Sequence, residues 1–85
     1  MLNVNLELIT WIKDGSNRIK VLKLLQKNGH LLPSELADEL DVHRASISRI
    51  LKDLKEKNLV ITTKSGSRTV SYSLSDLGRE ALEDL

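Results

Sequence analysis

The sequence has 85 residues, the length of one small domain, and we expect residues 1–85 to fold as a single unit. Hydrophobic residues make up 40% of the chain, but it contains no Phe, one Trp and one Tyr, so the core must be aliphatic. The absence of Cys excludes disulfides and thiolate metal sites. No apolar run approaches the ~20 residues that cross a bilayer, and the N-terminus lacks the basic start of a signal peptide. We therefore expect a cytoplasmic protein.

The N-terminal residues carry two overlapping apolar patterns. Residues 2–8 alternate between apolar and polar side chains, as in a strand, whereas Val4, Leu8 and Ile12 recur at helical spacing. We favour a helix over residues 4–13, ended by the Asp-Gly pair that follows. A segment this apolar must be covered, either by the last helix of the same chain or by a second copy.

Residues 16–28 predict a second helix, with Ser16 as its N-cap. Gly29 marks its end, because glycine tolerates the left-handed conformation of a helix C-cap. Residues 30–32 form a short link, at most one short strand. Pro33 then suits the first turn of the next helix, where its missing N–H does no harm.

A short helix over residues 34–40, a three-residue turn and a third helix from about His43 to Lys57 follow. The acidic residues of the short helix lie early in it, where the helix dipole favours them. The third helix carries one apolar stripe, as expected of a helix that packs on a core. The stripe consists of Ile47, Ile50, Leu51 and Leu54.

Residues 59–63 and 69–74 are rich in β-branched residues and flank a polar turn around Gly66, so they predict a hairpin. Ser75 and Asp76 can cap a last helix. The expected fold is therefore mainly α with a β-hairpin (α+β), in the order helix, helix, short strand, helix, turn, helix, two strands, helix. Its parts are an N-terminal segment at 1–15, a helix-turn-helix at 34–57, the hairpin at 59–74 and a C-terminal helix at 75–85.

The charge is unevenly distributed along the chain. Residues 42–68 contain seven Lys or Arg and two acidic residues, a net charge of +5, whereas the rest of the chain carries −4. A basic segment in an otherwise acidic chain is typical of a face that binds a polyanion. Chance clustering on a solvated helix is the alternative.

Three stretches carry a family resemblance: PSELADELDVHRASISRILKDLKEKNLV, then TTKSGSRTVSYSLS, then DLGREALEDL. Together with the preceding helix they cover about four fifths of the chain. The chain resembles the winged helix-turn-helix transcriptional regulators of bacteria and archaea typified by the MarR and ArsR families. The resemblance implies a recognition helix at residues 43–57 in the major groove of DNA, with the hairpin as a wing on the backbone or minor groove.

The resemblance assigns DNA contacts to the early recognition helix and to the wing tip, residues 64–68. Helical geometry agrees, because Ala45, Arg49 and Lys52 lie about 140–200° around the helix from Ile47. The DNA-binding residues are expected to be His43, Arg44, Ala45, Ser46, Ser48, Arg49 and Lys52 in the helix, and Lys64, Ser65, Ser67 and Arg68 in the wing.

Two of these positions stay open. His43 occupies a place where Ser or Thr usually caps the recognition helix, so it either caps the helix or reads DNA. Arg44 either contacts a phosphate or pairs with a nearby carboxylate.

The expected function is sequence-specific binding of double-stranded DNA as a transcriptional regulator. The alternatives are a winged-helix module for protein–protein interaction and a sequence-neutral DNA-binding chromosomal protein. We expect no enzyme and no cofactor, since no nucleophile with a base and no phosphate-cradling glycine loop occurs. His30 and His43, with no Cys, do not predict a metal site.

Regulators of this type usually bind DNA as dimers, because two half-sites multiply a modest affinity. We expect a homodimer built from the terminal helices, while any small-molecule effector stays open. The expected interface residues are Leu2, Leu6, Ile9, Trp11, Ile12, Leu82 and Leu85.

Overall fold

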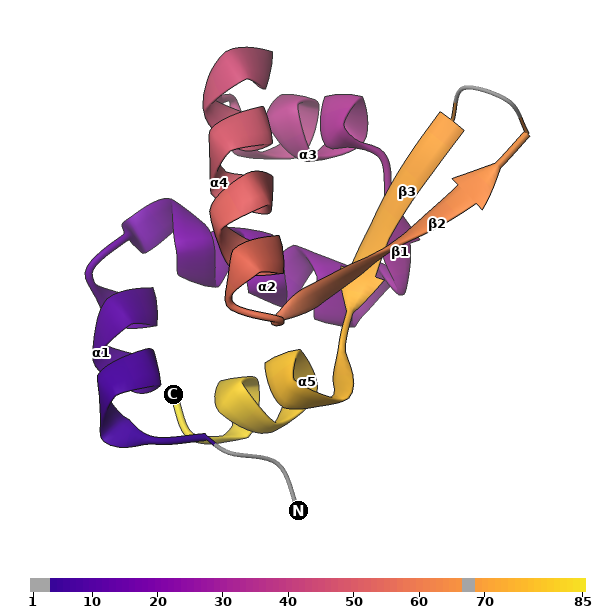
Figure 1. Cartoon of the computed structure of the whole chain (residues 1–85). Helices are drawn as coiled ribbons and strands as arrows, with labels where there is room; N and C mark the ends of the chain where they lie inside the picture. The colour runs from indigo at the N-terminus through magenta and orange to yellow at the C-terminus, as the bar shows by residue number, and fades with distance from the viewer. Residues whose placement is uncertain (1–3, 67–68) are drawn as a thin grey trace.

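The computed structural model describes residues 4–66 and 69–85, apart from the side chain of Ser65. In these residues five helices pack together, and a small antiparallel sheet lies along one side of them (Figure 1). The elements are α1 (Leu6–Lys13), α2 (Ser16–Asn28), β1 (His30–Leu31), α3 (Pro33–Leu40), α4 (Arg44–Glu56), β2 (Val60–Ser65), β3 (Thr69–Leu74) and α5 (Asp76–Glu83). The predicted order of elements is confirmed, including the short strand.

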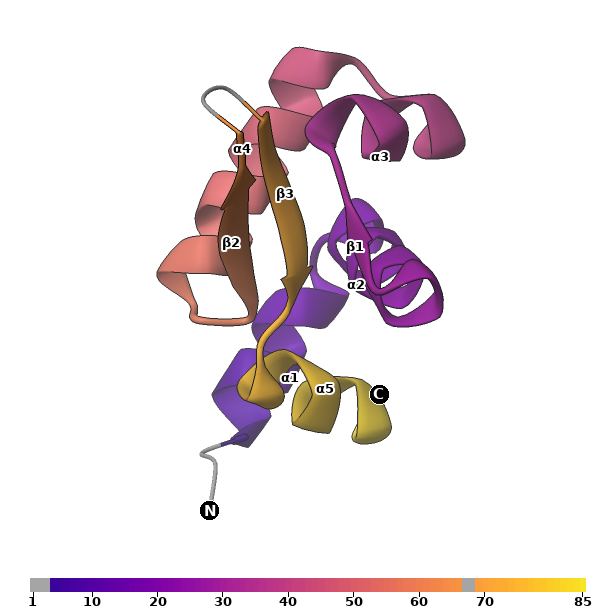
Figure 2. The ribbon, with the colours of Figure 1, turned by 90° about the vertical axis from the view of Figure 1, so that its right-hand side faces the viewer.

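The sheet has the order β1-β3-β2, and Figure 2 shows β3 between its two neighbours. The β2–β3 hairpin is regular from Val60 opposite Leu74 to Ser65 opposite Thr69. The two residues of β1 extend the sheet on the other side, with His30 opposite Ser73. The hairpin therefore stands beside α3 and α4, while α1 and α5 lie at the opposite end of the molecule.

One aliphatic core joins all five helices to the sheet, as the composition predicts. The apolar stripe of α4 packs into it, although Ile50 is only half-buried. The buried hydrophobic residues are Ile9, Ile12, Val21, Leu22, Leu25, Leu36, Ala37, Ile47, Leu51, Leu54, Leu59, Val60, Leu74 and Ala81.

The helix ends follow local capping chemistry. The side chain of Asn5 caps α1 by accepting from the Leu8 N–H at 2.8 Å. Gly29 ends α2 with φ at 88°, as predicted. The expectation that Ser16 is an N-cap is wrong, because Gly15 occupies the N-cap position and Ser16 is the first helical residue.

Ser75 joins the end of the hairpin to α4 and α5. Its Oγ accepts from the Gly78 N–H at 3.0 Å and donates to the carbonyl oxygen of Asn58 at 2.6 Å. The first turn of α5 lies so close to the chain after α4 that a Cβ on Gly78 would stand 2.2 Å from the Leu59 carbonyl oxygen. Glycine is therefore required there for close packing.

Candidate nucleic-acid interface

The helices α3 and α4 form a helix-turn-helix. The turn between them and the buried side of α4 fix the orientation of α4. Asp41 takes the left-handed conformation with φ at 54°, and the Val42 N–H donates to the carbonyl oxygen of Ala37 at 3.0 Å. Ile47 and Leu54 are fully buried on one side of α4. Burial of this stripe turns the opposite side of α4 to solvent.

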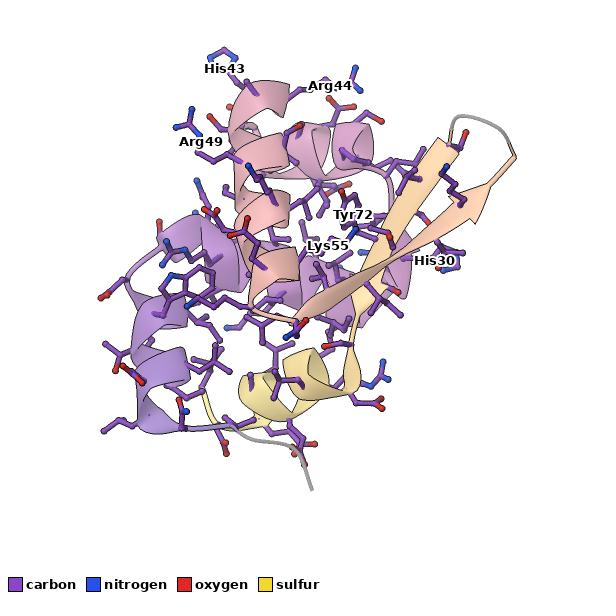
Figure 3. The ribbon with its side chains drawn as sticks, in the orientation of Figure 1. His30, His43, Arg44, Arg49, Lys55 and Tyr72 are labelled. Atoms are coloured by element: carbon purple, nitrogen blue, oxygen red, sulfur yellow. The ribbon has the colours of Figure 1, made fainter. Side chains whose placement is uncertain are left out.

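All seven residues expected to contact DNA from the recognition helix are exposed. They do not form one flat surface, however. Figure 3 shows Arg49 extending away from the hairpin, whereas Arg44 lies on the hairpin side of the helix. The two arginines therefore lie on different sides of α4.

His43 occupies the N-cap position of α4, but its side chain makes no capping hydrogen bond. Its imidazole is exposed beside the open groove that Asp38 and Asp41 line. The capping alternative is thus excluded in this conformation. The expectation that His43 contacts DNA stays a prediction.

Arg44 makes no ion pair among the residues described, which removes the alternative that it pairs with a carboxylate. It instead lines an open groove with Ser34 and Thr69, from the first residues of α3 and β3. The sequence pattern predicts a DNA contact for neither hydroxyl residue. No local pattern could have found them, because β3 comes close to the start of α3 only by pairing with β1, the strand that precedes α3.

The hairpin places Lys64 on β2 opposite Val70, with its side chain exposed. Gly66 follows with φ at 77°, a conformation that favours glycine in the turn. Ser67 and Arg68 lie outside the described residues, as does the side chain of Ser65. Their predicted contacts with DNA stay predictions.

The expected dimer interface needs correction. Ile9 and Ile12 are 8% and 0% exposed in the single chain, since both pack into its own core. They offer almost no surface to a second copy, so their assignment to the interface is wrong. These two side chains of α1 are covered by the same chain, which is the alternative to coverage by a second copy.

The remaining interface candidates differ among themselves. The ring of Trp11 is partly covered by cations, with the Arg18 guanidinium carbon 3.9 Å and the Lys57 Nζ 5.3 Å from its centroid. Leu82 and Leu85 are half-buried against the core. Leu6 is 80% exposed, and Leu2 lies outside the described residues.

Two kinds of feature are absent from residues 4–66 and 69–85. No group of three or more His, Cys, Asp or Glu side chains is placed to hold a metal ion. No helix there has the length and apolar character needed to cross a membrane.

A family model described as the HVO_A0261 N-terminal domain matches residues 7–85. The chain belongs to this family. It is 32% identical over 66 residues to an uncharacterized HTH-type transcriptional regulator of Methanocaldococcus jannaschii, MJ1325, and it covers 74% of that protein. It is 39% identical over 71 residues to the HTH-type transcriptional regulator Rv2034 of Mycobacterium tuberculosis and covers 64% of it.

Solved structures agree with this fold. The chain superposes on the YusO protein of Bacillus subtilis with a TM-score of 0.78 and 30% identity, covering 81% of this chain and 50% of YusO. It also matches the transcriptional regulator Tm0710 of Thermotoga maritima with a TM-score of 0.81 and 18% identity, covering 91% and 56% of the two chains. The winged helix-turn-helix fold and the resemblance to MarR-type regulators are therefore confirmed. The chain spans only about half the length of these two structures.

Proposed function

We propose that this domain binds double-stranded DNA in a sequence-specific manner as part of a transcriptional regulator. The observation that carries the proposal is the exposed polar face of α4, with Arg49 and Lys52, presented beside a hairpin that carries Lys64. An α-helix fits the major groove, and arginine can donate two hydrogen bonds to a guanine edge. The regulator names of the two sequence relatives support the proposal.

In this arrangement α4 enters the major groove and α3 crosses the backbone. Ala45, on the same side of α4 as Arg49, leaves room for close approach or touches a thymine methyl group. Lys64 holds a flanking phosphate without reading sequence. In this proposal the domain binds DNA and catalyses no reaction. It acts in the cytoplasm, where bacteria and archaea keep their chromosome.

The test is to select bound fragments from the source genome and to measure their affinity by gel shift against unrelated competitor DNA. Sequence-specific binding gives a retained complex that is ~10³-fold or more tighter than the complex with competitor. Equal affinity for all fragments would instead support a sequence-neutral chromosomal protein. The absence of any complex at low salt would favour a protein-interaction module.

We also propose that the protein forms a homodimer through the end of the molecule that holds α1 and α5. Leu6, which is 80% exposed, would supply the centre of the apolar patch that such an interface needs. Leu82 and Leu85 lie half-buried at the same end. The interface then consists of Leu6 and the C-terminal residues, without Ile9 and Ile12.

Sedimentation equilibrium at increasing protein concentration tests the dimer. Leu6→Glu should shift the equilibrium to monomer while the fold is retained, since this side chain contributes little to the core. Thr63→Glu, at an exposed position of β2, which lies away from α1 and α5, is a control for added charge. A wild-type protein that stays monomeric at high micromolar concentration contradicts the proposal.

A further inference from the structure

Two open grooves flank the start of α4, and their charges are opposite. The groove on the hairpin side has a volume of about 290 Å³ and is lined by Leu32, Pro33, Ser34, Arg44, Thr69 and Val70. The other groove has a volume of about 630 Å³ and is lined by Ala37, Asp38, Asp41, Val42, His43 and Ser46. They lie at opposite ends of α3, whose eight residues span about 12 Å.

The groove on the hairpin side combines one cation with two hydroxyl donors. Arg44 presents a guanidinium, which suits the oxygens of a phosphate, and it has no carboxylate partner in the described residues. Ser34 and Thr69 can each donate one further hydrogen bond. Of the backbone groups there, Pro33 has no N–H and the Leu32 N–H is already used, since it donates to Glu35 Oε1 at 2.8 Å, which also holds that carboxylate on the backbone.

The other groove has the opposite character. Asp38 and Asp41 line it, both with exposed carboxylates. A phosphodiester placed there would face two negative charges at short range. The DNA backbone is therefore attracted to one end of α3 and repelled from the other.

We propose that the groove formed by the first residues of α3, α4 and β3 binds a phosphodiester group of the DNA backbone, with Arg44 as its cation. This inference rests on the proposed function and adds a site to it. Arg44 and Arg49 are separated by about 140° around the helix axis. Arg44 is thus a positioning residue that reads no base, and it sets the rotation of α4 so that Arg49 faces the base edges.

The site predicts the course of one DNA strand across the protein. The strand passes between α4 and the hairpin, over Ser34 and Thr69, and it leaves the acidic end of α3 uncovered. His43 and Ser46 then lie beside the groove that repels phosphate, so they contact bases or nothing.

The experiment measures binding of the whole chain by fluorescence anisotropy from about 50 to about 200 mM salt. The probes are a duplex selected from the source genome and a random-sequence duplex of equal length. Arg44→Gln should lower the slope of log affinity against log salt by about 0.9. It should also weaken both duplexes by the same factor, about tenfold at the lowest salt. Arg44→Lys should restore the slope.

Lys55→Gln is the matched control for the lost charge. Lys55 lies on nearly the same side of α4, about 20° around the axis from Arg44, but about 16 Å further along it (Figure 3). This substitution should leave the slope within experimental error. Because both side chains are exposed, the thermal midpoints of the variants should match that of the wild type.

Two more variants locate the site. Thr69→Val removes one donor from the groove and should weaken both duplexes equally, by about threefold. Asp41→Asn neutralises the other groove while keeping a residue that tolerates the left-handed backbone, and it should change affinity by less than about twofold at 0.15 M salt, where screening is strong.

An unchanged slope in Arg44→Gln overturns the phosphate site while the proposed function stands. A loss confined to the selected duplex makes Arg44 a base-reading residue and also overturns it. A large gain in affinity from Asp41→Asn would mean that the backbone crosses the acidic groove instead. If the wild-type protein binds neither duplex, the proposed function fails and this site fails with it.

Discussion

The helices α1 and α4 cover the same core but present different surfaces to water. In α4 the exposed side is polar and carries Arg49 and Lys52, whereas α1 exposes Leu6. In α4 the apolar residues fall on one stripe, so the buried side follows from the helical period. In α1 they cover more than half of the circumference, about 220° from Trp11 to Leu6, so the period alone does not say which of them the domain covers. The buried side of a helix can therefore be predicted where apolar and polar residues occupy separate sides. A high content of apolar residues alone is not sufficient.

Ile12→Ala should have the largest effect and tests whether α1 belongs to the core. Ile12 has no exposed surface, so the substitution leaves a cavity and should lower the free energy of unfolding by about 2–5 kcal/mol. Urea denaturation followed by circular dichroism measures the loss. If α1 were held only by a second copy, the loss would depend on protein concentration instead.

Leu6→Ala is the control on the same helix. Its exposed side chain leaves no cavity, so unfolding of the monomer should change by less than about 0.5 kcal/mol. Equal losses from the two substitutions would contradict the orientation of α1 in the structure.

Arg49→Ala tests the exposed side of α4. If Arg49 reads a base, the substitution should cost about 1–3 kcal/mol of binding free energy for the selected duplex and relax its specificity. Stability should not change, because the side chain is exposed. Arg79→Ala is the matched control, an exposed arginine on α5 at the other end of the molecule, and it should leave affinity unaltered. Binding that survives the loss of both Arg49 and Lys52 would contradict the recognition helix.

Ser75→Ala should have a smaller effect, and it tests the joint between the two ends of the molecule. The hydroxyl caps α5 and also bonds to Asn58 at the end of α4, so its loss should cost about 1 kcal/mol of stability. Thermal unfolding measures the change. Asp76→Asn next to it breaks only the exposed ion pair with Arg79 and should cost a few tenths of a kcal/mol. A larger loss of stability from Asp76→Asn than from Ser75→Ala would contradict the role of the Ser75 hydroxyl as a cap.

The order of elements and the helix-turn-helix could be predicted from the sequence because their signals are local. Gly29, Ser75 and the stripe of α4 each specify a helix end or face through neighbours within a few residues. The prediction for Ser16 is wrong by one residue because Gly15, which can also take the N-cap conformation, precedes it.

The remaining features depend on contacts between distant segments. The burial of Ile9 and Ile12 depends on α2 and the rest of the core, which lie outside α1 itself. The groove that holds Arg44 needs Thr69, from a strand that follows α4 in the chain. The helical period predicts that Arg49 lies opposite the core. It does not predict that Arg44 lies on the side of α4 that faces the hairpin.

Lys64→Ala should leave stability unchanged and act on DNA binding alone, and it tests whether the hairpin supplies general charge or sequence reading. Lys64 is exposed on β2 opposite Val70, so the strand pairing does not depend on its ammonium group. Loss of one phosphate contact should lower the salt slope by about 0.9 and weaken selected and random duplexes equally. Lys20→Ala, which removes an exposed cation from α2, should leave the slope unchanged. A loss of affinity for the selected duplex alone would mean that Lys64 contacts a base. The hairpin would then contribute to sequence recognition together with α4.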